Sequence, residues 1–302
     1  MKHTLDNVQL KKYAGLPIGF SIPILEPHIE TAFRKKIYPY ISAQMLSDLK
    51  NSTTESKKDI ADLILKAAAN YTVVTAIPFI KVKFNTSGID QYDQEKMKTA
   101  PWWDVRDLGL ASVKVADEAM SDALTAIGKD PVLKAACTFF TEFSYAPIPT
   151  PEEFNKIYTI NKSLDVYNLL VPIMKRVWMF SVLNKIKDCA VEQITINPNL
   201  RELLRDSLAY FALAYALKLS QFTFITSGVV IQYEELPWQK SLILSDSAKD
   251  KLEDEFLNIA NDSLGSILKF LKDHPTDFPC YKPVVTIEST RKIIEKKSGL
   301  YL

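Results

Sequence analysis

A chain of 302 residues with a hydrophobic fraction of 47% and a charged fraction of 24% has a globular composition, which excludes a disordered, collagen-like or coiled-coil protein. Its 37 basic and 36 acidic residues leave a net charge of +1, which argues against a nucleic-acid coat or a polybasic membrane binder. Only 8 residues are glycine, so a glycine-rich nucleotide-binding fold is disfavoured and a mainly helical fold is expected.

Helical patterning dominates the first part of the chain. From about Ile24 to Leu49 apolar residues recur at every fourth position, which keeps them on one helix face, and Pro39 predicts a break in this helix. A second helix is predicted to start near Asp59 and to stop at Pro78, because proline cannot continue the hydrogen-bond ladder.

The apolar period then shortens from about four residues to two, as Val82 and Phe84 alternate with lysines. This alternation predicts a strand, with Ile89–Tyr92 as a weaker second arm that leaves open either a hairpin or one strand and a loop. A long helix is predicted to follow Pro101–Trp102 and to end near Gly128, since glycine favours a helix C-terminus.

Three prolines fall within five residues between Tyr145 and Pro151, which predicts an extended, semi-rigid linker. We therefore expect a first helical-bundle unit at 1–144, a linker at 145–151, a second helical-bundle unit at 152–278 and a C-terminal tail at 279–302. The two units are called the first and second unit below.

The second unit repeats the first. With a shift of 140 residues Thr86–Ile89 aligns with Thr226–Val229, and with a shift of 145 residues Pro27 aligns with Pro172. The matched features keep their order along both halves, so we interpret the chain as a tandem duplication of one helical-bundle unit. The helix after Asn197–Pro198 is apolar on almost all sides and is expected to be buried centrally.

The predicted fold class is therefore mainly α: a duplicated helical bundle, a short β-hairpin or strand appended to each copy, and a strand-like tail. Two runs of strand composition flank Ser227–Gly228, which predicts a tight hairpin in the second unit. In the tail, Pro283–Ile287 has strand composition and could either add to a sheet of a neighbouring chain or pack on its own unit.

The sequence carries no motif of an active site. Its histidines, His3, His28 and His274, lie outside any zinc-binding spacing, and no nucleophile elbow or phosphate-binding glycine loop occurs. The carboxylates from Asp250 to Glu255 alternate with lysines and are interpreted as a solvated helix face. We therefore predict no catalytic residue, no cofactor and no metal, and expect that the chain is not an enzyme.

The three cysteines, Cys137, Cys189 and Cys280, are sparse and are expected to be reduced, packed thiols. The N-terminus lacks the apolar core of a signal peptide. The longest strongly apolar helical run, Ser207–Leu217, is about half the length of a membrane span. We expect no membrane partner.

The turns, the tryptophans and the tail favour a function in protein–protein contacts. The matched turns would project edges that pair with a neighbouring strand, the tryptophans could anchor a subunit contact, and the tail could extend a neighbour's sheet. The candidate interface residues are Ser87, Gly88, Trp103, Ser227, Gly228, Val229, Val284, Val285 and Ile287.

The order of these features resembles a family of proteins from tailed phages and prophages of Bacteroidetes that look like head–tail connectors. The resemblance is carried by Leu10–Tyr13, the alanine-rich helix Ala67–Phe79, the turn Thr86–Gly88 and the pair Trp102–Trp103. It covers most of the chain. Connectors of this kind carry one helical bundle with a hairpin per subunit, whereas this chain carries two in tandem.

The resemblance implies a structural virion protein at the neck, made in the host cytoplasm. It implies a ring, expected to be dodecameric, that lies beneath the portal protein, extends the DNA channel and offers a docking surface to tail and neck proteins. Passing DNA would be contacted only non-specifically. The alternatives are another tail or ring component of the virion, or a non-viral cytosolic helical scaffold or binding module. An enzyme whose site is assembled from distant residues ranks third.

Overall fold

A computed structural model describes residues 5–16, 22–80, 82–85, 88–91, 102–186, 194, 196–225, 228–231 and 244–281, and all structural statements concern these residues. They are mainly helical. The helices of the first unit are α1 (Asn7–Ala14), η1 (Ile22–Ile24), α2 (Glu26–Ala32), η2 (Phe33–Ile37), α3 (Ala43–Lys50), α4 (Glu55–Ile80), α5 (Trp102–Lys129), α6 (Pro131–Ala136) and η3 (Phe139–Phe143). Its strands are β1 (Val82–Asn85) and β2 (Gly88–Gln91).

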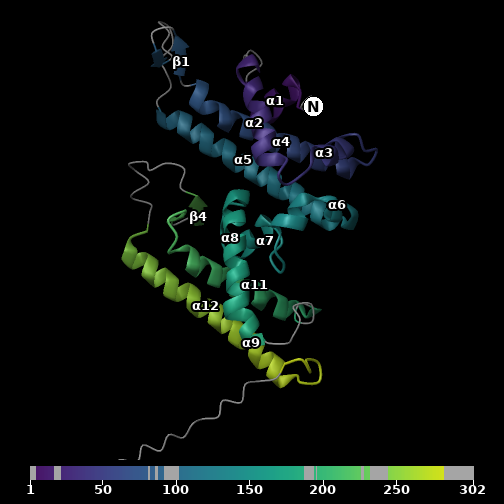
Figure 1. The fold of residues 1–302 in the computed structure, drawn as a ribbon, viewed down its shortest axis with the longest axis vertical. Helices are drawn as coiled ribbons and strands as arrows, with labels where there is room; N and C mark the ends of the chain where they lie inside the picture. The colour runs from purple at the N-terminus through teal and green to yellow at the C-terminus, as the bar shows by residue number, and fades with distance from the viewer. Residues whose placement is uncertain are drawn as a thin grey trace, which may run out of the picture.

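The second unit follows the same plan. Its helices are α7 (Pro151–Ile157), α8 (Leu164–Val177), η4 (Trp178–Leu183), α9 (Asn184–Ile186), α11 (Pro198–Ala216) and α12 (Asp246–Asp273). Its strands are β3 (Phe222–Ile225) and β4 (Gly228–Ile231). The first unit lies at one end of the long axis with α1, α2 and β1, and the second unit lies at the other end with α9 and the end of α12 (Figure 1).

Corresponding elements in the two units match in kind and length. The long helices α5 and α12 both contain 28 residues, and η2 and η4 are both π-helical turns that continue a preceding α-helix. Strand β1 begins at Val82 and β3 at Phe222, which is the offset of 140 residues found in the sequence. This correspondence is compatible with a duplicated unit.

Short polar side chains fix where the helices begin. The Ser163 hydroxyl accepts a hydrogen bond from the Val166 amide at the start of α8, and the Asn197 side chain caps α11 directly before Pro198. Thr150 caps α7 in the same way before Pro151. These caps satisfy amides that the helix cannot, and proline suits the first helical position because its missing amide hydrogen would have no partner there.

Helix α4 differs from its prediction. It begins at Glu55 and continues through Pro78 to Ile80, whereas the sequence analysis placed its start near Asp59 and its end at Pro78. Proline removes only its own amide hydrogen bond, and near a helix end the loss of one bond does not prevent another half turn. The predicted helix from Ile24 to Leu49 is divided into η1, α2, η2 and α3.

The core is a single connected cluster of buried side chains that draws on both units, from Leu5 to Phe278. Helix α11 supplies buried residues on almost all its sides, as its composition predicted. Its exposed residues are Pro198, Asn199, Arg201 and Glu202 at the start and Tyr215, which is 47% exposed, near the end. Helices α4 and α5 pack together in the first unit, and α11 and α12 pack together in the second.

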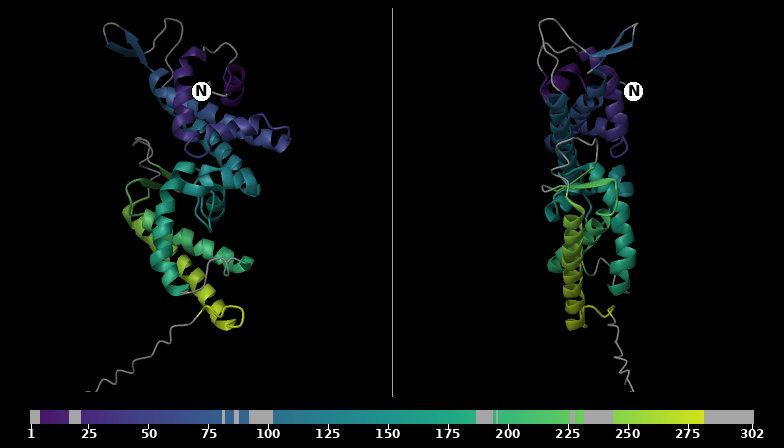
Figure 2. Two further views of the ribbon diagram at one scale, coloured as in Figure 1. Left: turned by 45° about the vertical axis from the view of Figure 1, so that its right-hand side comes forward. Right: turned by 90° about the vertical axis from the view of Figure 1, so that its left-hand side faces the viewer.

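Each unit carries one antiparallel pair of strands. In the first, Asn85 stands opposite Gly88, and in the second Ile225 stands opposite Gly228. Strands β1 and β2 extend away from the helices (Figure 2). Strand β4 lies closer to the body, and its Val229 amide donates a hydrogen bond to the Thr159 carbonyl over 3.1 Å.

The proline-rich segment is folded rather than extended, so the prediction of an extended linker is wrong. Tyr145 and Ile148 form an antiparallel β-bridge, and the peptide bond between Ala146 and Pro147 is cis. The chain therefore turns back on itself between the two units. The polar contacts that hold this turn are described below.

Of the two described cysteines, one differs from the prediction of reduced thiols. Cys137 is free and buried, as expected. Cys280, in the turns after α12, is disulfide-bonded, so its prediction as a reduced thiol is wrong. Cys189 lies outside the described residues.

Candidate functional site

The most elaborate polar arrangement among the described residues lies between the two units, and we call it the inter-unit joint. The first unit contributes Lys36, Tyr40, Tyr71, Asp117 and Asp122, and the second contributes Glu152, Lys162, Ser163, Asp165 and Asn168. On one side these residues come from η2, the turn after it, α4 and α5. On the other side they come from α7, α8 and the loop between them.

Two direct contacts cross the joint at η2 and the turn that follows it. The Lys36 ammonium lies 2.5 Å from a carboxylate oxygen of Asp165. The side-chain amide of Asn168 donates a hydrogen bond to the Tyr40 hydroxyl over 2.8 Å. Because both contacts join residues more than 100 positions apart, they fix the second unit against the first.

Asp117 is the buried carboxyl of the joint. It is 3% exposed, and its carboxylate accepts hydrogen bonds from the hydroxyl groups of Tyr71 and Ser163. Burial raises the pKa of Asp117 to about 6, since the charged form loses its hydration. The same Ser163 hydroxyl accepts the α8 cap bond, so the start of α8 is tied to α5.

Lys162 adds an ion-pair bridge at the edge of the joint. Its ammonium lies 3.2 Å from Asp122 of α5 and 2.8 Å from Glu152 of α7. The hydrogen bond to Glu152 raises the pKa of Lys162, and the charge of Asp122 adds to the effect. This bridge is partly exposed, so its contribution to stability is small compared with the buried contacts.

Apolar and aromatic contacts complete the joint. The Phe139 and Tyr167 rings approach to 6.0 Å between centroids, and both side chains are fully buried. The Phe139 amide donates to the Tyr40 carbonyl over 2.9 Å, and the Cys137 thiol donates to the same carbonyl over 3.4 Å. The segment that leads into the linker is therefore packed against both units.

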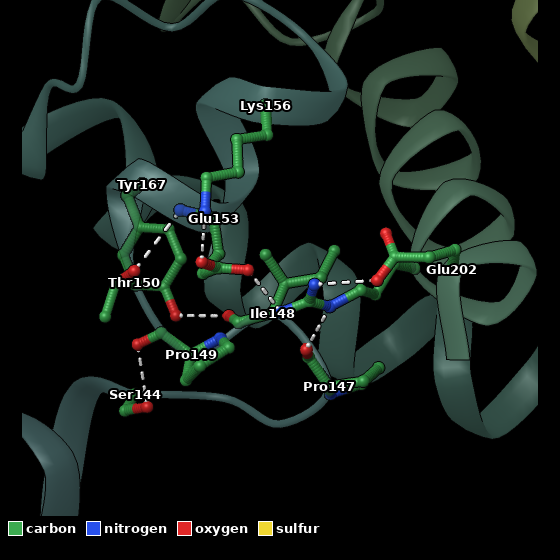
Figure 3. A network of polar contacts seen from close by, with 10 residues as sticks. Ser144, Pro147, Ile148, Pro149, Thr150, Glu153, Lys156, Tyr167 and Glu202 are labelled. Carbon is green, nitrogen blue, oxygen red and sulfur yellow. Dashed lines mark hydrogen bonds and ion pairs between the residues drawn. The ribbon is translucent and has the colours of Figure 1, made fainter. Parts of the chain in front are cut away.

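The folded linker is held by side chains of the second unit (Figure 3). The Tyr167 hydroxyl donates to the Ile148 carbonyl over 2.8 Å and accepts a hydrogen bond from the Tyr145 amide over 3.3 Å. The Arg205 guanidinium, from α11, donates to the Pro147 carbonyl over 3.0 Å and lies 2.5 Å from Glu153 of α7. These bonds make the linker a rigid connection.

Neither of the two hollows described here reaches Asp117, the buried carboxyl of the joint. A hollow of about 310 Å³ lies between α3 and α6, and another of about 230 Å³ lies beside the start of α12. Asp117 lines neither hollow, and within the described ranges no group of three His, Cys, Asp or Glu side chains is placed to hold a metal ion. Apart from the Asn168 amide oxygen, which is buried without a hydrogen-bond partner, the joint's polar side chains bond to one another, which is the arrangement of a structural contact.

The carboxylates at the start of α12 lie on the surface, paired with lysines. Glu253 lies 2.6 Å from Lys218, and Asp246 lies 3.4 Å from Lys249. This agrees with their interpretation as a solvated helix face.

The candidate interface residues are dispersed over the molecule. Gly88 and Gly228 begin β2 and β4, and Trp103 lies in the first turn of α5. Val229, a candidate interface residue, is completely buried within its own unit, so its prediction as an interface residue is wrong. Five further candidates lie outside the described residues: Ser87, Ser227, Val284, Val285 and Ile287.

Sequence reasoning missed the joint itself. Each of its residues is an ordinary polar side chain on a helix, and no local spacing links Lys36 to Asp165. The available signal was Ser163, which precedes an apolar-periodic run as a helix cap does.

In the part of the chain that the structure describes, two helices are long and apolar enough to cross a membrane, so the expectation that Ser207–Leu217 is the longest apolar run is wrong. They are Glu55–Phe79 and Leu164–Ile186. Of the most apolar 18 residues of each helix, 67% are buried within the fold in the first and 39% in the second. Buried core helices meet the same criteria of length and composition, so this observation is weak support for a membrane span.

No curated protein and no solved structure matches the chain. The sequence does match the DUF6712 family, described as a family of unknown function, over residues 25–125 and 179–291. The first matched region lies within the first unit, and the second begins in the second unit and runs into the tail, which is compatible with a duplicated unit. Since the match covers more than half of the sequence, the chain belongs to the DUF6712 family.

Proposed function

We propose that the chain is a structural assembly protein, a head–tail connector that forms a ring beneath the portal of a tailed phage and extends the DNA channel. The observation that carries the proposal is the inter-unit joint. It turns two like helical units into one elongated body and uses buried polar groups for contact rather than for chemistry.

The tandem organisation belongs to the same proposal. We propose that the units arose by duplication, that each carries a β-hairpin as an appendage, and that residues 279–302 form an added tail. In a ring of such chains, each chain would contribute two copies of the unit. The partners would be further copies of the chain, the portal protein and tail or neck proteins, with DNA touched only in passage.

An enzymatic function would start from Asp117, the carboxyl whose pKa burial raises furthest. Its hydrogen bonds to Tyr71 and Ser163 instead account for it as a buried part of the joint. These bonds favour a structural role for Asp117 over a catalytic one. The localisation that we propose for the chain is the virion neck.

Loss of the gene from the phage or prophage that encodes the chain tests the proposal. A connector is needed to join a packaged head to its tail, so its deletion should yield DNA-filled heads and free tails. Expression of the chain in trans should restore complete particles. Complete, infectious particles without the chain would contradict the proposal and favour a cytosolic helical scaffold or binding module.

A further inference from the structure

The loop between α7 and α8, residues 158–163, lies in the inter-unit joint, and we call it the joint loop. Its last residue, Ser163, donates a hydrogen bond to the buried carboxylate of Asp117 and also caps α8. The preceding residue, Lys162, forms ion pairs with Asp122 and Glu152. The joint loop therefore attaches the start of α8 to α5.

The backbone of the joint loop is held in an unfavourable conformation. Asn161 has a φ of 55° and Lys162 a φ of 53°, so both lie in the left-handed region. Asparagine visits this region readily, but a lysine there is uncommon because its Cβ crowds the backbone. The Asn155 side-chain oxygen accepts hydrogen bonds from the Ile160 amide over 3.0 Å and from the Lys162 amide over 3.1 Å. Such a conformation persists only while the contacts around it are made.

The charged groups that face Asp117 do not balance. The Lys36 ammonium of η2 lies 2.5 Å from Asp165 of α8, and it lies 5.7 Å from the centre of the Tyr71 ring. The Tyr71 hydroxyl, from α4, donates to Asp117. Burial, with the charges of Asp165 and Asp117, raises the pKa of Tyr40 to about 12, so this hydroxyl stays neutral. With Asp117 ionised, the cluster holds two carboxylates and one ammonium, and a proton on Asp117 makes it neutral.

We infer that the joint loop is a pH-sensitive latch, which closes on α5 when Asp117 takes up a proton and opens locally when Asp117 is ionised. The proton removes the charge that burial disfavours. In the open state the carboxylate is hydrated, and the backbone at Lys162 relaxes from the left-handed region. The two units stay packed through their shared core, so the opening is confined to the joint loop and the cap of α8.

The latch is connected to the strands of the second unit. The Thr159 carbonyl, in the joint loop, accepts a hydrogen bond from the Val229 amide of β4 over 3.1 Å. Opening of the joint loop removes this acceptor, so the proton on Asp117 also controls whether β4 is tied to the joint. The inference does not depend on the proposed function, because it concerns contacts within one chain.

Amide hydrogen exchange in the full chain tests the latch. The reporting amides are those of Ile160, Lys162 and Val166. After correction for intrinsic exchange, their protection should rise about tenfold between about pH 7.5 and about pH 5, because the pKa of Asp117 is about 6 in the closed state and ordinary in the open one. At the higher pH they should exchange faster than the amides of α11, since the latch opens without global unfolding.

Two matched variants separate the charge of Asp117 from other effects. Asp117→Asn keeps an oxygen that accepts hydrogen bonds but carries no charge, so protection of the joint loop should become independent of pH. Asp122→Asn removes an exposed carboxylate of the same helix that pairs with Lys162. It should lower protection less than about threefold at both pH values and leave the pH dependence intact.

Three outcomes would overturn the inference. They are equal protection of the joint loop at both pH values in the parent chain, a pH dependence that survives Asp117→Asn, and joint-loop amides that exchange only as fast as those of α11. The first and third are measured on the parent chain, so they do not depend on the folding of a variant. A Val229 amide that ignores pH while the joint loop responds would overturn the connection to β4.

Discussion

Asp117 is a buried carboxyl group, so its burial disfavours its charged form. It is 3% exposed, and burial raises its pKa to about 6 despite the hydrogen bonds from Tyr71 and Ser163. The folded protein therefore holds a proton that the unfolded chain has released between about pH 4 and pH 6. Above that window the folded state carries the full cost of the buried charge.

Asp117→Asn should remove this cost. The amide oxygen can still accept the Tyr71 hydrogen bond, and the side chain is neutral at every pH. Urea unfolding at about pH 7.5 should show a gain of up to about 3 kcal/mol over the parent chain, and the gain should fall to about 1 kcal/mol near pH 4.5 and vanish near pH 3. Asn261→Asp is the control, because Asn261 is exposed and corresponds to Asp117 when the two 28-residue helices α5 and α12 are aligned, and it should show no such pH dependence. A pH-independent difference for Asp117→Asn would contradict the account.

Tyr167 is the residue that ties the linker to α8. Its buried hydroxyl serves both the Ile148 carbonyl and the Tyr145 amide. Tyr167→Phe should lower the free energy of unfolding by about 1–3 kcal/mol, because both backbone groups lose their partner. Tyr215→Phe, at a residue 47% exposed, should change it by less than about 0.5 kcal/mol. Equal effects of the two substitutions would show that the linker bonds carry no stability.

Among the elements, the linker differs most from the structure that its sequence predicts. Three prolines indicate a spacer, but its polar groups find partners on α7, α8 and α11, which fold it into a turn. Arg205 is central to this, because it contacts both the Pro147 carbonyl and Glu153. Although burial acts in the opposite direction, the hydrogen bond from Lys156 and the charge of Arg205 lower the pKa of Glu153.

Arg205→Ala should therefore loosen the linker. We expect a loss of about 1–3 kcal/mol in unfolding free energy and faster amide hydrogen exchange in 145–150. Arg34→Ala removes an exposed ion pair, with the arginine 72% exposed, and should cost less than about 0.5 kcal/mol. Unchanged exchange in the linker after Arg205→Ala would contradict this view of the element.

Other elements followed more closely from the sequence. The position of α11 was predictable because apolar residues surround it, and the end of α5 lies near Gly128 as expected. The extension of α4 through Pro78 was not, because a single proline near a helix end only weakly disfavours another half turn.

For the whole molecule, the joint was beyond sequence reasoning. Lys36 meets Asp165, and Tyr40 meets Asn168, only after both units have folded and packed. Periodicity reports which face of a helix is apolar, but it does not report which distant polar residue will lie opposite. The order of the elements could be predicted because the apolar pattern changes in the same order along both halves of the sequence.

The shared core predicts that the two units unfold together. One cluster of buried side chains runs through both units, and the joint adds hydrogen bonds between them, from Ser163 to Asp117 and from Asn168 to Tyr40. Differential scanning calorimetry should therefore show one transition, with a calorimetric enthalpy equal to the van't Hoff enthalpy. Two separate transitions would mean that the joint does not couple the units.

The measurement that tests the proposed connector function most directly is the copy number of the chain in purified particles of the phage or prophage that we propose encodes it. Quantitative mass spectrometry with the portal protein as internal standard gives this ratio. A connector ring predicts a small, fixed ratio of the chain to the portal protein, close to that of two stacked rings. A chain that is abundant in infected cells but absent from particles would contradict its assignment as a connector.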